Sequence, residues 1–367
     1  MLDITASDRL AVKSFATKTP VFVCVISYTA TSEILGLTVA GANAELVKYT
    51  SPADAEFLFR GRCSCIDVVP ATPDGKPTPA LITRTALQLA RIPLLVVDAG
   101  AKVKPSIPYV SFGVEPGRNI IKESAMDISN VKRAFEYGEL LGKQLAIMSD
   151  LIVVGESIPG GTTTALAVLR ALDIDARFKV SSSMPENPHN LKNKVVDSAI
   201  DRVIASGIER IISPFEAISA FGDPMMPSVA GIASGVLSAN GKIMLAGGTQ
   251  MSVVVAILKR LNRPLEGLYI GTTTYVTKDP SSDLSGLVRM VSERVPILSC
   301  DLHLDESSKP GLQAFAKGFV KEGVGAGGAS IVAITKSRGK ITGKKLMNAV
   351  EKEYEVSIEE ASGHSPI

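Results

Sequence analysis

Residues 151–165, with the sequence LIVVGESIPGGTTTA, decide the fold class of this chain. Their first four residues are all apolar, which predicts a buried β-strand, because a strand covered on both faces forms a continuous apolar run. A glycine-rich turn follows, and the residues after it have helical spacing. A strand that passes through a tight turn into a helix is the repeating unit of parallel α/β sheets.

The same alternation of strand and helix extends to both sides of this stretch. Further apolar runs predict strands at 21–28, 94–97, 211–212, 243–246, 268–270 and 331–334. Helical spacing is found at 163–172, 194–206, 229–238, 252–261 and 343–354. The run 331–334 could equally continue a helix from the glycines before it. The pattern predicts a doubly wound, mostly parallel sheet flanked by helices, with a smaller appended N- and C-terminal helical part.

No internal repeat and no low-complexity linker divides the chain. The polar, proline-rich stretch 69–79, VPATPDGKPTP, is either a surface loop or the end of an N-terminal segment. We therefore expect an N-terminal segment at 1–90, which either stands apart or belongs to the main domain. A nucleotide-binding α/β domain follows at 91–340, and a C-terminal helix with a frayed tail at 341–367.

Composition excludes several functional classes. The chain has 39 basic and 37 acidic residues and a net charge of +2, so no basic surface for nucleic acid is expected. The four cysteines contain one C-x-C pair, Cys63 and Cys65, without a second pair, and the three histidines lack metal-ligand spacing, so no metal is predicted. Neither a signal peptide nor an apolar span is found. We expect a cytoplasmic protein that binds no membrane.

The turn within 151–165 is the clearest candidate binding loop. Gly155, Gly160 and Gly161 let the backbone approach a ligand closely. Thr162 or Thr163 can cap the helix that follows, whose first N–H groups attract anions. The turn matches neither a Walker A loop nor the G-x-G-x-x-G pattern. It predicts a phosphate or carboxylate site, and the alternative is a tight turn with a threonine cap.

Two polar side chains accompany this predicted anion site. Glu156 would repel phosphate, so it should face a ribose hydroxyl or the reacting base, unless it is an exposed loop residue. Gln250 ends a second strand-to-helix loop, AGGTQM, where its amide would bind a heterocycle edge or would cap the helix. The residues before it are also expected to bind substrate: Gly247, Gly248 and Thr249.

A third loop, FGDPMMPSVAG at 221–231, precedes another apolar helix. Its Gly222 and Asp223 are candidate substrate contacts. An aspartate at this place is more often a helix N-cap than a ribose ligand, and we expect the cap.

Glu322 is the best candidate catalytic base. It lies directly before four glycines in six residues, Gly323, Gly325, Gly327 and Gly328. Such a run forms helix poorly and is kept where the backbone must approach a ligand or another element. A carboxylate removed from water there would have a raised pKa, which suits a general base near neutral pH. The alternative is an exposed glutamate before a turn.

Taken in order, the motifs resemble the nicotinate-nucleotide–dimethylbenzimidazole phosphoribosyltransferases, especially their archaeal and cyanobacterial-type members. The motifs are GESIPGGTTTA, LKNKVVDSAI, FGDP…SVAGIASGVL, KIMLAGGTQMSVVVAIL and KEGVGAGGA, which together span 151–330. The resemblance implies a homodimer that needs no cofactor. It implies transfer of a phosphoribosyl group from nicotinate mononucleotide to a benzimidazole-type base, giving an α-ribazole 5′-phosphate for cobamide lower-ligand synthesis.

The resemblance also assigns individual roles. It makes Glu322 the catalytic base, Glu156 the second carboxylate and Lys194 a phosphate contact, and it places the 1–90 segment at the base pocket. The family's Pro-Pro-Gly-Ser-Leu-Gly element is absent, its Gly-Asp-His-Gly loop is replaced by VDAGAKV, and its Ser-His loop by GTTTYVTKD. The accepting base is therefore open between benzimidazole and purine types. A nucleotide sensor or an N-glycosidic hydrolase on the same fold are the alternatives.

Overall fold

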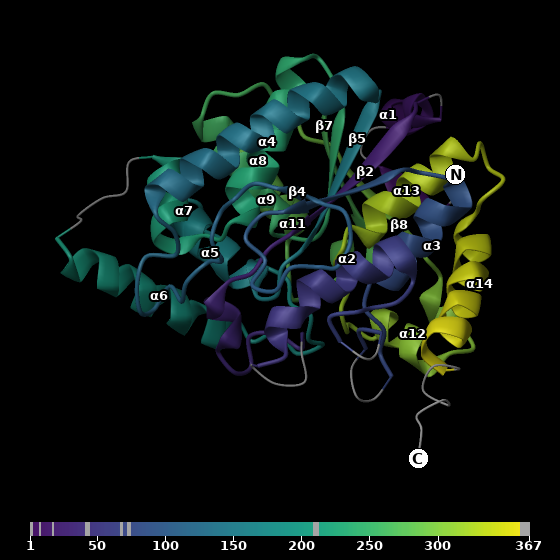
Figure 1. The fold of residues 1–367 in the computed structure, drawn as a ribbon, viewed down its shortest axis with the longest axis horizontal. Coiled ribbons are helices and arrows are strands. Elements are labelled where there is room, and N and C mark those ends of the chain that lie inside the picture. Colours follow the sequence, from purple (N-terminus) through teal and green to yellow (C-terminus); the bar gives the residue numbers. More distant parts are fainter. Residues whose placement is uncertain are drawn as a thin grey trace.

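Within the part of the chain that the structure describes, eight strands pair into one sheet in this computed structural model (Figure 1). The sheet has the order β1-β8-β7-β6-β5-β2-β3-β4, and every pair is parallel except β1 with β8. This confirms the predicted fold class. The strands are β1 Ile4–Ala6, β2 Pro20–Ile26, β3 Leu94–Asp98, β4 Val110–Ser111, β5 Leu151–Ser157, β6 Ile243–Ala246, β7 Leu268–Thr273 and β8 Ile297–Cys300.

The structure describes residues 3–6, 9–16, 18–40, 45–66, 69–71, 75–207 and 213–359. The strand predicted at 211–212 and the tail predicted at 361–367 lie outside these ranges. No helix within them is long and apolar enough to cross a membrane. Strands β1 and β2, from the predicted N-terminal segment, belong to the same sheet as the strands of the predicted main domain.

The alternating side chains of each strand serve two separate cores. On β2, Val23 and Val25 pack into one core, and Phe22, Cys24 and Ile26 pack into the other. All five are fully buried, because helices cover both faces of the sheet. This explains why these strands are continuous apolar runs in the sequence.

Each core is closed by its own set of helices (Figure 1). One face carries α4 Ile128–Met148, α5 Gly161–Ala171, α6 His189–Ala205, α7 Pro214–Phe221, α8 Met225–Ser238, α9 Met251–Arg260 and α11 Leu284–Val291. The other carries α1 Arg9–Phe15, α2 Thr50–Arg60, α3 Ala80–Ala90, α12 Pro310–Ala316, α13 Ala326–Lys336 and α14 Gly343–Tyr354. A π-helical turn, Glu355–Glu359, follows α14.

The strand predicted at 331–334 is wrong, and the helical alternative is confirmed. These residues lie in α13, which packs against β6, β7 and β8 on one side and α3 on the other. Because the helix is enclosed on all sides, its apolar residues show no polar face and resemble a buried strand in the sequence. The helices predicted at 163–172, 194–206, 229–238, 252–261 and 343–354 are confirmed as α5, α6, α8, α9 and α14.

The strand order creates a switch point between β2 and β5. From β2 the chain adds β3 and β4 on one side, then returns to add β5, β6, β7 and β8 on the other. In open parallel sheets a crevice forms at the carboxyl ends of the strands that flank such a point. The residues that follow β5 therefore lie where a ligand site is expected.

Candidate active site

A cavity of about 930 Å³ lies at the carboxyl end of β5. Its walls come from α2 and the loop after it, the β5–α5 turn, the loop 181–183, the loop 320–324 and the turn 356–358. Half of the sequence-predicted site residues line it: Glu156, Gly160, Gly161, Thr162, Gly248, Gln250, Glu322 and Gly323. The cavity thus brings together the loops that follow β5 and β6 and the loop between α12 and α13.

The other predicted site residues lie behind or away from the cavity. Gly155 packs against Gly325, since a Cβ built on either would lie within about 3.0 Å of the other's Cα. Asp223 is buried and accepts hydrogen bonds from Thr164 Oγ1 at 2.6 Å and from two backbone N–H groups at the start of α8. The remaining ones that do not line the cavity are Thr163, Lys194, Gly222, Gly247 and Thr249.

The start of α5 opens into the cavity. Gly160 precedes the helix with a φ of 76°, in the left-handed region that favours glycine. Gly161 and Thr162 form the first turn, which contains no acidic residue. The first N–H groups of a helix have no intrahelical partner and carry partial positive charge, so this end of the cavity suits an anion such as phosphate.

Glu322 is fixed in the cavity by hydrogen bonds to its carboxylate. The Oε2 atom accepts from Thr273 N at 3.0 Å and Thr272 Oγ1 at 3.3 Å, and the Oε1 atom accepts from Gly327 N at 3.2 Å and Gly323 N at 3.3 Å. Burial raises the pKa of Glu322 to about 7, against the opposing effect of these hydrogen bonds. A carboxyl group with this pKa can accept a proton near neutral pH.

Three of the four glycines after Glu322, Gly325, Gly327 and Gly328, serve packing. A Cβ on Gly327 would lie 2.0 Å from the carbonyl carbon of Thr272, and a Cβ on Gly328 would lie 2.3 Å from Ala246 Cβ. The glycines therefore let the start of α13 press against the ends of β6 and β7. This contact brings the Gly327 N–H to Glu322, so the packing of the helix also fixes the carboxylate.

Glu156 is the second carboxylate of the cavity and is buried. Gln250 Nε2 donates a hydrogen bond to Glu156 Oε1, so the two predicted polar residues contact each other. Burial raises the pKa of Glu156 well above its usual value, and the charges of Asp223 and Glu322 raise it further. The Glu156 backbone carbonyl accepts from Val324 N at 2.9 Å, which ties the β5–α5 turn to the Glu322 loop.

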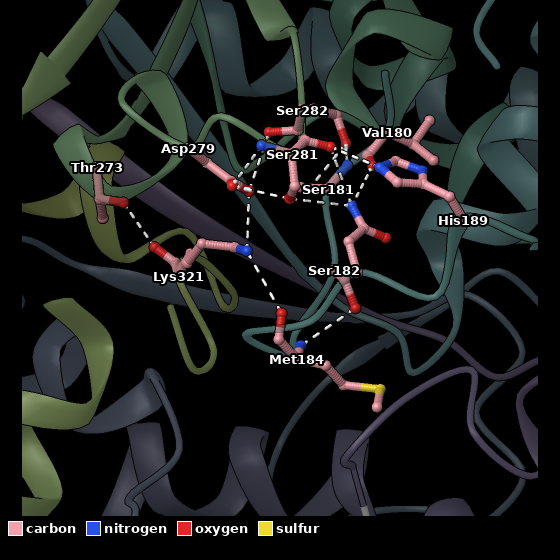
Figure 2. A network of polar contacts seen from close by, with 12 residues as sticks. Val180, Ser181, Ser182, Met184, His189, Thr273, Asp279, Ser281, Ser282 and Lys321 are labelled. Carbon is pink, nitrogen blue, oxygen red and sulfur yellow. Dashed lines mark hydrogen bonds and ion pairs between the residues drawn. The ribbon is translucent and has the colours of Figure 1, made fainter. Parts of the chain in front are cut away.

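Lys321, which the sequence analysis did not single out, anchors the Glu322 loop (Figure 2). Its Nζ atom lies 2.8 Å from Asp279 Oδ2 and donates to the Met184 carbonyl at 3.5 Å. Both side chains of the ion pair are almost fully buried, with 5% and 6% exposure. The backbone carbonyl of Lys321 accepts a hydrogen bond from Thr273 Oγ1 at 2.6 Å. The sequence feature that could have indicated Lys321 is its position directly before the candidate base, Glu322.

Lys192, and not the predicted Lys194, contacts a residue of the cavity wall. The predicted phosphate contact Lys194 is exposed on α6. Lys192 is fully buried, and its Nζ donates to the carbonyl of the cavity residue Ser181 at 2.5 Å and to Asn187 Oδ1 at 3.1 Å. Burial lowers the pKa of Lys192 to about 7, aided by the charge of Lys321.

Asp54, on α2, is a third carboxylate in the cavity that the sequence analysis missed. Only 3% of the residue is exposed. It accepts hydrogen bonds from Thr78 Oγ1 at 2.6 Å and Ser157 Oγ at 2.7 Å. Burial raises its pKa to about 6. The available signal was an acidic residue between two alanines, Ala53 and Ala55. Within the described ranges, no group of three His, Cys, Asp or Glu side chains could hold a metal ion.

Comparison with known proteins identifies the fold and the family of the chain. A solved structure of nicotinate-nucleotide–dimethylbenzimidazole phosphoribosyltransferase from Thermus thermophilus has the same fold, with a TM-score of 0.60 and 15% identity. The alignment covers 99% of this chain and 96% of that one. Among curated sequences, a UPF0284 protein from Archaeoglobus fulgidus is 50% identical, covering 91% of this chain and 93% of its own length. A UPF0284 protein from Sulfurisphaera tokodaii is 46% identical, with 91% and 92% covered.

The family model DBI_PRT, described as phosphoribosyltransferase, matches residues 82–309. This match includes β5, β6, β7 and the helices that follow them, which carry most of the motifs identified in the sequence. The family that the motif order predicted is thereby confirmed. The chain belongs to the DBI_PRT family of phosphoribosyltransferases.

Proposed function

We propose that this protein transfers the 5-phosphoribosyl group of nicotinate mononucleotide to a benzimidazole- or purine-type base. The product would be α-ribazole 5′-phosphate or an analogue, a precursor of a cobamide lower ligand. The observation that carries the proposal is the pairing, in one cavity, of the start of α5 with the half-buried carboxylate of Glu322, whose pKa is about 7.

In this proposal the helix start of α5 holds the phosphate of the nucleotide. Gly160 and Thr162 supply backbone N–H groups there, whereas Gly161 N donates to the Ile158 carbonyl at 3.4 Å, and the first turn contains no acidic residue. Holding the phosphate at one end of the cavity directs the ribose toward the two glutamates. The volume of about 930 Å³ accommodates a nucleotide together with a second heterocycle.

Glu322 acts as the general base. A ring nitrogen of the incoming base attacks C1′ of the ribose, the bond from C1′ to nicotinate nitrogen breaks, and Glu322 takes the proton from the attacking base. Glu156, held by Gln250, faces a ribose hydroxyl or the reacting base and orients it. The nicotinate leaves with the electron pair of the broken bond, so the transfer involves no change of oxidation state.

The test is an incubation with nicotinate mononucleotide, with and without dimethylbenzimidazole or adenine, followed by mass spectrometry. We expect a ribosyl-phosphate product that requires the added base. Glu322→Gln should lower turnover by at least about 10²-fold while nucleotide binding survives. Glu266→Gln, on an exposed residue, is the control and should change nothing.

Three results would contradict the proposal. Nicotinate release that is indifferent to added base would indicate a hydrolase. Nucleotide binding without any release would indicate a sensor. Full activity in Glu322→Gln would remove this carboxylate from the mechanism.

A further inference from the structure

Asp54 is a carboxylate of the cavity to which the proposed reaction assigns no function. It lies in the cavity on α2, next to the end of β5, where Ser157 Oγ donates to its Oδ2 atom at 2.7 Å. Ser157 follows Glu156 on β5, where successive side chains point to opposite faces of the sheet, so Asp54 and Glu156 line the same cavity from the two sides of the strand end. Neither general-base action nor phosphate binding requires a third carboxylate here.

The hydrogen bonds around Asp54 have a fixed direction. Thr78 Oγ1 accepts from Ala80 N at 3.2 Å, so its own hydrogen is directed to Asp54 Oδ1 at 2.6 Å. Both neighbouring hydroxyl groups therefore donate, and the carboxylate only accepts. Each carboxylate oxygen has a second lone pair that remains available for a donor from the cavity.

Among the residues that the structure describes, Asp54 has no cationic partner. None of the ion pairs formed by the described residues includes it. A buried carboxylate without a positive partner is unfavourable unless further donors reach it. Such a group at the edge of a cavity is typical of a site that receives the donor from a ligand.

Apolar residues form part of the cavity wall, alongside the polar side chains of Arg62, Lys76 and Thr78. The apolar residues include Ala53, Pro77 and Pro79, and Ile66 and Ile358 also contribute to the walls. Flat heterocycles bind in apolar pockets that offer a few well-placed polar groups. A single acceptor in such a wall distinguishes ligands by whether they present an N–H at that edge.

We propose that Asp54 selects an acceptor base that carries an N–H donor outside the reacting ring nitrogen, such as the amino group of an aminopurine. This inference rests on the proposed function, because it assigns the base subsite of that reaction. Dimethylbenzimidazole presents methyl groups at its outer edge, and these would leave the carboxylate unpaired. An amino group would satisfy it, and a site built to bind a donor discriminates strongly against analogues that lack one.

The experiment is a direct binding measurement by calorimetry, which needs no turnover. Adenine, N6,N6-dimethyladenine and dimethylbenzimidazole are titrated into the wild-type protein, Asp54→Asn and Ser157→Ala. For the wild-type protein we expect adenine to bind at least about tenfold more tightly than the dimethylated analogue, from one hydrogen bond to a charged group. In Asp54→Asn this preference should shrink to about twofold or less.

Ser157→Ala is the matched control, because it changes the same wall but keeps the carboxylate, so the preference should persist. The wild-type comparison of the two adenines needs no variant and stands even if Asp54→Asn fails to fold. Equal affinity of the wild-type protein for both adenines overturns the inference. An unchanged preference in a folded Asp54→Asn protein also overturns it.

The two proposals fail separately. If adenine binding depends on Asp54 but nicotinate mononucleotide is never consumed, the base subsite stands and the transferase reaction falls. If the protein makes a product from dimethylbenzimidazole and Asp54→Asn does not alter the choice of base, the reaction stands and the assignment of Asp54 falls.

Discussion

Two glycine-rich segments of this protein look alike in sequence and differ in structure. In the segment 155–161, the glycines at the start of α5 line the cavity. In the segment 321–328, three of the glycines press α13 against the strand ends, where no ligand fits. Each segment carries one glutamate of the cavity. The comparison teaches that glycines next to a carboxylate can leave room for a ligand or can allow close packing of a helix on a sheet. In the second case the packing still fixes the position of the carboxylate.

The largest difference is expected for alanine substitutions of the two kinds of glycine. Gly327→Ala places a Cβ 2.0 Å from the Thr272 backbone, which no side-chain movement relieves. We expect it to lower the free energy of unfolding by at least about 4 kcal/mol. Gly161→Ala meets only the flexible Ile158 side chain, at 2.9 Å, and should cost within about 1 kcal/mol. Urea unfolding followed by circular dichroism measures both, and equal losses would break the comparison.

The second segment is also anchored by charge. Lys321→Met leaves Asp279 buried without its cation, and we expect a loss of about 3 kcal/mol. The double variant Lys321→Met/Asp279→Asn removes the uncompensated charge and should recover part of that loss. The exposed pair of Lys344 and Glu306 gives the control, since Lys344→Met should change stability by about 0.5 kcal/mol or less. Additive losses in the double variant would contradict this account.

The pH dependence of kcat/KM should distinguish the roles of Glu322 and Glu156. Glu322 acts as a base only when ionised, and its pKa is about 7. The value of kcat/KM should therefore fall as pH decreases below 7, by about tenfold per pH unit, and should level off above 7. Glu156→Gln should keep this acid limb. Loss of the limb in Glu156→Gln would assign the base role to Glu156 instead.

The smallest expected effect is the change in the free energy of unfolding caused by Glu156→Gln. Burial holds the pKa of Glu156 well above the usual value, so the folded state binds a proton more tightly than the unfolded chain does. At pH 8 the unfolded chain ionises this carboxyl freely, whereas the folded state must either take up a proton or bury the charge, so Glu156 lowers the stability of the fold there. Glu156→Gln should raise the free energy of unfolding there by about 1 kcal/mol, and the gain should vanish as pH falls to the unfolded pKa. Thermal melting at pH 8 and pH 5 checks this, and a gain that grows at pH 5 would have the wrong sign.

Much of the fold followed from the sequence because most of its strands are buried on both faces. The apolar runs at 94–97, 243–246 and 268–270 are strands β3, β6 and β7. The run 331–334 was ambiguous, because a helix enclosed on every side has no polar stripe to reveal its period. Strands β1 and β4 are short edge strands and leave no comparable signal.

The site was predictable where a glycine-rich loop adjoins a polar side chain and unpredictable where packing between distant residues decides. Glu156 and Glu322 stand out because each adjoins a glycine-rich loop. The choice between Lys192 and Lys194 depends on which side of α6 faces the protein, and the motif alone does not settle it. Asp54 and the pair of Lys321 with Asp279 depend on contacts between residues far apart in the chain, which no local pattern encodes.

The antiparallel strand β1 has a consequence for synthesis on the ribosome. Ile4 pairs with Cys300, so the first strand to emerge has no partner until β8 has been made. During this interval the nascent chain must keep an unpaired strand from associating with other chains. Contacts between such distant residues also slow folding. We expect the parallel centre of the sheet to assemble first and β1 to close its edge last.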